Sequence, residues 1–427
     1  MTWLQRYRLK DSFRNSVWLP AAVSIPAAIL AARLAEPVDH LVRWIPPVGI
    51  EGTRVVLTAL ASAMLTFIVF VFSILLLAVQ LASAQLTPRV IAHFYRGRTL
   101  RVSLCVFVFV FTFDLAVLAR MEESVPALSA HVAAFGTVAA IGIFLYMIEK
   151  VGKSLRPVSV LTSVGRVGHD VIAAVYPHGV SQTDNVPVTS PAAPAASGPR
   201  TVANLRPGVV LAFDPAGLAD LARRADSVIE VVPQVGDFVA AGDPLFRVHG
   251  GSTIADRDLQ QHIAIGPERT MEQDPAFAFR IIVDVAAKAL SPAINDPTTA
   301  VLAIDQLHHL LRSVGLRNLD TGQVRDESGR LRLVYRTPDW DDFVDLATTE
   351  IRHYGRDSIQ VARRMRAMLE SLIRVVPPQR SARLREELDL LHRTVDRAFL
   401  DAEDRTRAGR GDSLGVGGAG TGASQAQ

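Results

Sequence analysis

Four long apolar stretches in the first 150 residues constrain the fold of this chain more than any other feature. They cover residues 15–36, 54–85, 102–119 and 129–148. A helix needs about 20 mainly apolar residues to cross the hydrocarbon core of a bilayer, and each stretch approaches or exceeds that length. The first stretch lacks the short apolar core and small-residue cleavage site of a secretory signal peptide. We therefore predict an integral membrane domain of four helical spans over residues 1–150.

Basic residues are concentrated in alternate connections between these stretches. They precede the first stretch, separate the second from the third and follow the fourth: Arg6, Arg8, Lys10 and Arg14, then Arg89, Arg96, Arg98 and Arg101, then Lys150, Lys153 and Arg156. The other two connections are richer in acidic residues. Because Lys and Arg are enriched in cytoplasmic loops, both termini and the whole C-terminal half are predicted to be cytoplasmic.

Composition excludes several function classes. The net charge is only +3, with basic and acidic residues interspersed, which is unlike a nucleic-acid-binding protein. The single cysteine, Cys105, cannot form a disulfide within the chain or supply a zinc or redox motif. The adjacent His308 and His309 point about 100° apart on a helix, so we interpret them as structural rather than as metal ligands. No metal and no cofactor are predicted.

Two polar features lie inside the predicted spans. Small polar side chains recur near one face of the second span: Thr58, Ser62, Thr66, Ser73 and Gln80. Such a stripe is compatible with a water path and with close helix packing. Asp114 lies in the third span, where a carboxylate is expensive and marks a functional site by default. The alternative is that Asp114, less than two turns from Arg120, reaches the outer interface.

The remaining chain reads as a water-soluble α+β region. Residues 151–176 alternate apolar and basic positions, typical of a helix on the inner membrane surface, and 177–200 form a flexible linker or insertion. Residues 201–250 show short apolar runs separated by turns, similar to a lipoyl-type half-barrel without its modified lysine, which predicts a small structural β module. Residues 251–403 are mainly helical, and a disordered tail follows over 404–427.

Aspartate-proline pairs mark three helix starts, at Asp214, Asp274 and Asp296. Ser291 to Ala300, Ser-Pro-Ala-Ile-Asn-Asp-Pro-Thr-Thr-Ala, separates two helical patterns and contains two prolines, an Asn-Asp pair and two threonines. Capping and turn formation account for much of this composition. A binding site is the alternative interpretation.

Several segments resemble one protein family. They are the Ala-Ser-Ala-Gln-Leu-Thr-Pro-Arg segment ending at Arg89, Val235 to Leu245, Ile265 to Pro275, and Val283 to Ala300. The chain is similar along most of residues 10–400 to the bacterial predicted membrane proteins grouped as domain of unknown function 2254. The resemblance implies a bacterial inner-membrane location and four spans followed by a soluble region, and it implies no activity. This chain departs from the family at Glu149 and Lys150, where the family often has histidines.

Three functions are compatible with these observations. The first is a membrane-anchored binding or regulatory protein whose ligand or ion lies near Glu268–Thr299. The second is an oligomeric channel or transporter with Asp114 and the polar face of the second span lining a path. The third, catalysis through Asp284, Lys288 and Ser291, lacks an oxyanion-type motif and is not predicted. The expected partners are the lipid bilayer, a second copy of the chain and an unidentified small ligand or ion. The candidate ligand-binding residues are Glu268, Arg269, Thr270, Asp274, Ser291, Asn295, Asp296, Thr298 and Thr299, and the intramembrane candidates are Asp114, Gln80, Ser73 and Thr66.

Overall fold

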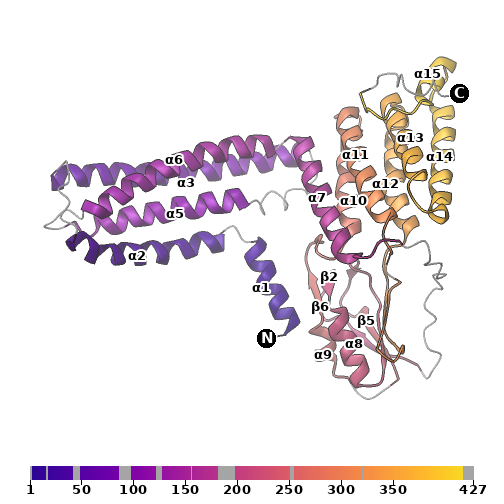
Figure 1. Cartoon of the computed structure of the whole chain (residues 1–427), viewed down its shortest axis with the longest axis horizontal. Helices are drawn as coiled ribbons and strands as arrows, with labels where there is room; N and C mark the ends of the chain where they lie inside the picture. The colour runs from indigo at the N-terminus through magenta and orange to yellow at the C-terminus, as the bar shows by residue number, and fades with distance from the viewer. Residues whose placement is uncertain are drawn as a thin grey trace. The chain divides into compact units, whose positions relative to one another are not determined.

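The computed structural model of the chain describes residues 2–15, 18–41, 49–85, 98–121, 127–154, 156–180, 198–250, 254–319 and 321–416. The chain divides into two compact units (Figure 1). Arg8–Ser159 form the first, which we term the bundle. Met1–Tyr7 and Val160–Gln427 form the second, the C-terminal unit. The short helix α1 (Trp3–Asn15) begins in the C-terminal unit and ends in the bundle.

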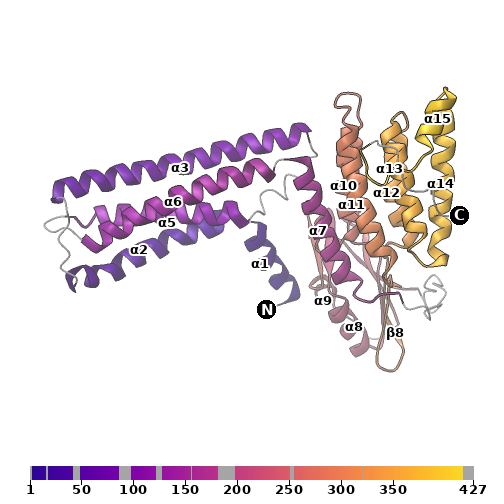
Figure 2. The ribbon, with the colours of Figure 1, turned by 45° about the horizontal axis from the view of Figure 1, so that its top comes forward.

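Helices in the described residues match the predicted spans. The bundle contains α2 (Trp18–Leu41), α3 (Ile50–Gln85), α5 (Arg98–Leu118) and α6 (Ala127–Ser154), which lie side by side in Figures 1 and 2. By length and composition, five helices of the described chain are long and apolar enough to cross a membrane: these four and α7 (Pro157–Val175). The sequence predicted four spans, so α7 requires a separate explanation.

The core of the bundle consists of two main apolar clusters along α5. One joins Phe113, Val117 and Met121 to alanines of α2, Leu57 of α3 and Ala133 of α6. The other joins Phe107 and Val110 to Met64 and Val71 of α3 and to Ala140 and Met147 of α6. Small alanine side chains on α2 allow it to pack against α5 along much of its length.

Helix α7 packs within the C-terminal unit. Its apolar side is buried, and a Cβ built on Gly168 would lie only 2.7 Å from the Cβ of Ala278. The rings of His169 and His309 stack with their centroids 5.1 Å apart. The prediction that this segment lies on the membrane surface is therefore corrected, because its apolar side is already covered by α10 and α11. The alternation of apolar and basic positions did not indicate this contact, in which Gly165 and Gly168 lie against Gln306, Ala278 and Leu310.

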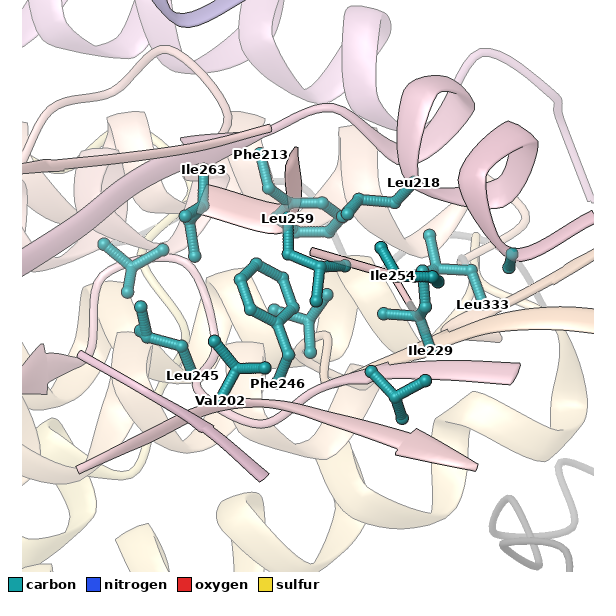
Figure 3. Packing of buried hydrophobic residues seen from close by; sticks show 14 of the residues in the cluster. Val202, Phe213, Leu218, Ile229, Leu245, Phe246, Ile254, Leu259, Ile263 and Leu333 are labelled. Carbon is teal, nitrogen blue, oxygen red and sulfur yellow. The ribbon is translucent and has the colours of Figure 1, made fainter. Parts of the chain in front are cut away.

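Two small sheets form the β module. The five-stranded sheet has the order β1 (Arg200–Ala203), β5 (Pro244–His249), β3 (Val228–Val231), β8 (Leu331–Tyr335), β7 (Gln323–Arg325). All its neighbours are antiparallel except β3 and β8, where Ile229 pairs with Leu333. The three-stranded sheet is β4 (Phe238–Val239), β2 (Gly208–Phe213), β6 (Ile263–Gly266). Helix α8 (Pro215–Arg224) contributes Leu218 to the shared core around Phe246, shown in Figure 3.

The β module therefore extends beyond the predicted boundary at residue 250. Strands β6, β7 and β8 come from the region that the sequence assigned to a helical domain. That region also supplies α9 (Asp256–Gln260), α10 (Pro275–Ala289), α11 (Pro297–Gly315), α12 (Trp340–Tyr354), α13 (Ile359–Ile373) and α14 (Pro378–Ala398). Helices α10 to α14 pack side by side (Figure 1).

The predicted tail needs a second correction. Helix α15 (Ala402–Ala408) follows α14, and the chain then runs along α13, where the backbone N–H of Asp412 donates to the carbonyl oxygen of Arg363 at 3.1 Å. Residues 417–427, and residues 181–197 of the predicted linker, lie outside the described part of the chain.

Candidate functional site

The predicted ligand-binding residues fall into two groups at opposite ends of α10. Glu268 to Asp274 precede the helix, and Ser291 to Thr299 follow it. Helix α10 contains 15 residues, which at 1.5 Å per residue separates its ends by about 22 Å. The two groups therefore do not form one site within a single chain, and each has to be judged separately.

The first group is built around a buried ion pair. The Asp274 side chain is 3% exposed, accepts from the backbone N–H of Phe277 at 3.0 Å and pairs with Nε of Arg269. Burial raises the pKa of the Asp274 carboxyl, although Arg269 opposes the shift. The Arg269 guanidinium also lies 5.3 Å from the ring centroid of Phe277 and packs against Gly236, whose φ is +96°. Asp274 and Arg269 thus hold the β module to the start of α10.

Two other members of the first group differ in environment. Glu268 is exposed, whereas Thr270 is 8% exposed and its hydroxyl has no hydrogen-bond partner among the described residues. The side-chain amide of Gln273 binds both backbone groups of Phe213: Oε1 accepts from the N–H and Nε2 donates to the carbonyl oxygen, each at 3.1 Å. The polar density before α10 therefore serves mainly to cap the helix and join it to the sheets.

The second group forms a helix–helix corner. Asp296 accepts from the backbone N–H of Thr299 at 3.0 Å and from its hydroxyl at 2.5 Å, which caps α11. Ser291 donates its hydroxyl to the carbonyl oxygen of Lys288 at 2.7 Å. Asn295 has φ of +50°, a conformation that asparagine tolerates better than most residues. Asn295 and Thr298 are exposed. Capping and turn geometry account for Ser291, Asn295, Asp296 and Thr299.

The adjacent histidines contact different partners. Nδ1 of His308 lies 3.3 Å from Nη2 of Arg364, and Nε of Arg364 pairs with Asp305 at 2.5 Å. Burial and then Arg364 lower the pKa of His308 to about 4. His309 stacks on His169 instead, and burial and His169 lower its pKa. No cluster of three or more metal-ligating side chains occurs in the described residues.

The polar stripe of α3 lies on the outer surface of the bundle. Thr58, Ser62, Thr66, Ser73 and Gln80 are all exposed. Each of the four hydroxyls donates to the carbonyl oxygen four residues earlier, at 2.8 to 3.0 Å. The stripe and Asp114 therefore do not line a common path within one chain, and a path formed by an oligomer stays a prediction.

Asp114 lies inside the bundle. Its side chain is 0% exposed, and neither carboxylate oxygen has a hydrogen-bond partner among the described residues. Arg120 does not reach it: Nε of Arg120 donates to the carbonyl oxygen of Ala116 at 3.2 Å, and Nη1 lies 3.4 Å from Oε2 of Glu36. The interpretation that Asp114 extends to the interface is thus contradicted by its burial. An isolated carboxylate ion is costly in such an environment, and binding a proton or a cation relieves the cost.

Sequence reasoning missed the polar residues at the end of the bundle nearest Asp114. Nη2 of Arg54 donates to the carbonyl oxygen of Met121 at 2.7 Å. Asp39 accepts from the backbone N–H of Ser129 at 2.9 Å and from its hydroxyl. These residues can be recognised in the sequence as acidic or basic residues at the ends of spans. We used such residues only to orient the spans in the membrane.

An apolar four-helix bundle joined to a separate α+β unit defines a multi-helix membrane protein. The sequence profile of the predicted membrane proteins described as domain of unknown function 2254 matches residues 14–371, and the chain belongs to this family. Uncharacterized proteins of Mycobacterium bovis and Mycobacterium tuberculosis are 28% identical to it over 421 residues, covering 94% of this chain and 80% of each relative. No solved structure matches the chain.

Proposed function

We propose that this protein binds a proton or a small cation at Asp114, within a bundle of four membrane spans. In this proposal α2, α3, α5 and α6 cross the bacterial inner membrane, and both termini face the cytoplasm. The distribution of Lys and Arg between the connections supports the orientation. Oligomerisation would be needed to form a continuous pore, so binding is the minimal function.

The observation that carries the proposal is the burial of an unpartnered carboxylate. Helix α5 has 21 residues, and Asp114 lies four residues before its end at Leu118, about 6 Å along the axis. The side chain therefore lies within the apolar span, and neither of its carboxylate oxygens has a hydrogen-bond partner in the described part of the chain. Structural carboxylates in the same protein, such as Asp274 and Asp296, each accept at least two hydrogen bonds.

A ligand held near Glu268–Thr299 has less support. Its residues lie at two ends of α10, and most of their polar atoms cap helices or pair with each other. The bundle is nevertheless connected directly to the C-terminal unit, since only residues 155 and 156 separate α6 from α7. Binding at Asp114 is therefore compatible with a regulatory role for the C-terminal unit.

The proposal is tested by the thermal stability of the full-length protein in lipid nanodiscs. Without alkali cations, the wild type is expected to lose stability as pH rises, because the ionised carboxyl is buried without a partner. At alkaline pH this loss is expected to be at least about 1 kcal/mol in the wild type. Asp114→Asn is expected to show no such loss. Glu51→Gln, which removes an exposed acid in the first turn of α3, is the matched control and should retain the dependence. An unchanged pH and cation dependence in Asp114→Asn would contradict the proposal.

A further inference from the structure

A set of polar contacts joins all four helices at the end of the bundle nearest Asp114. Glu36 of α2 pairs with Arg120 after α5, and Arg54 of α3 binds the carbonyl oxygen of Met121. Asp39 of α2 binds Ser129 of α6. We term these contacts the end latch. Nη2 of Arg120 is buried and has no hydrogen-bond partner among the described residues, so the latch keeps one unused donor.

The layers between Asp114 and the two ends of the bundle are unequal. Asp114 lies four residues from Leu118 at the latch end and 16 residues from Arg98 at the other end, or about 6 Å and about 24 Å along the helix. The longer route contains an aromatic cluster: Phe67 stacks on Phe144 with centroids 4.7 Å apart, and Phe107 lies 6.4 Å from Phe67. The shorter route contains Val117 and Met121 below the latch.

The two barriers also differ in strength. The Glu36 and Arg120 side chains are 54% and 26% exposed, and exposed ion pairs contribute little to stability because water replaces their contacts. Opening the aromatic cluster would instead expose several large apolar side chains. Local opening is therefore favoured at the latch end.

We infer that Asp114 exchanges its proton or cation through the latch end of the bundle, and that the Glu36–Arg120 and Arg54–Met121 contacts form its gate. This inference rests on the proposed function and adds the side of access and the residues that control it. The positive-inside distribution places the latch end opposite the cytoplasm.

Cysteine labelling of the full-length protein in sealed vesicles tests the inference. The background carries Cys105→Ser, and a charged, membrane-impermeant methanethiosulfonate is added to one side at a time. Glu51→Cys marks the latch end and Lys153→Cys marks the opposite end, since both residues are exposed at helix ends. Asp114→Cys is expected to react only from the side that labels Glu51→Cys. Combination with Arg120→Ala or Glu36→Gln should increase the rate by about two- to fivefold, because either change breaks a half-exposed ion pair of modest strength.

A second pair of positions keeps the test independent of the Asp114 substitution. Val117→Cys, on the short route, should become reactive when the latch is broken, whereas Val110→Cys, beyond Asp114, should not. Lys153→Gln breaks the Lys153–Glu149 pair at the opposite end and should leave all rates unchanged. Labelling from the Lys153→Cys side, or rates unaffected by the latch variants at both Asp114 and Val117, would overturn the inference. The nanodisc stability measurement reports binding at Asp114 separately, so failure of access is distinguishable from failure of binding.

Discussion

At the scale of single residues, the structure separates side chains that shape the backbone from side chains left without a partner. Asn295 is at a left-handed position, and its N–H donates to the carbonyl oxygen of Ser291 at 2.9 Å. The next N–H, of Asp296, donates to the carbonyl oxygen of Ala289 at 2.8 Å. The unusual composition of this corner therefore reflects chain reversal. Asp114 has no comparable role in the backbone.

Substitution of Asn295 tests this assignment. Asn295→Gly is expected to leave stability within a few tenths of a kcal/mol of the wild type, whereas Asn295→Ala should cost about 1 kcal/mol, because a Cβ opposes positive φ. Denaturant unfolding of the C-terminal unit, followed by fluorescence in the full-length protein, measures the difference. Equal stability of the two variants would show that the left-handed backbone does not explain the asparagine.

At the scale of elements, the sequence predicted helix starts from local patterns, but it did not predict contacts between elements that are distant in the chain. Asp214, Asp274 and Asp296 were predicted to cap helices, and each accepts from the backbone N–H three residues later. The parallel pairing of β3 with β8 joins Ile229 to Leu333, and no periodicity in either segment signals its partner. The docking of α7 was missed for the same reason, because it depends on which residues of α10 and α11 face its glycines.

The two glycines of α7 provide a matched pair of substitutions. Gly168→Ala places a methyl group against the Cβ of Ala278, which cannot rotate away, and should destabilise the C-terminal unit by about 1–3 kcal/mol. Gly165→Ala meets mainly the flexible end of Gln306, so improved helix propensity should leave stability unchanged or raised by up to about 1 kcal/mol. Thermal unfolding of both variants checks the order. A Gly168→Ala protein as stable as Gly165→Ala would contradict the packing of α7 described above.

At the scale of the whole molecule, the apolar pattern predicted the four bundle helices and the separate C-terminal unit. The environment of Asp114 could not be predicted in the same way. Its position in α5 follows from sequence, but its burial depends on how α2, α3 and α6 surround that helix. The same arrangement places the α3 stripe outside, so two polar features that looked equivalent in sequence have opposite environments.

Infrared difference spectroscopy of Asp114 tests the central claim most directly. For the full-length protein in lipid, titration with protons and with alkali cations should produce a carbonyl band of a protonated carboxyl that is not hydrogen-bonded. This band should be absent from Asp114→Asn and retained in Glu51→Gln, because Asp114 carries the only buried carboxylate without a hydrogen-bond partner among the described residues. An identical set of carboxyl bands in the wild type and in Asp114→Asn, under every proton and cation condition, would contradict the claim that Asp114 is the binding site.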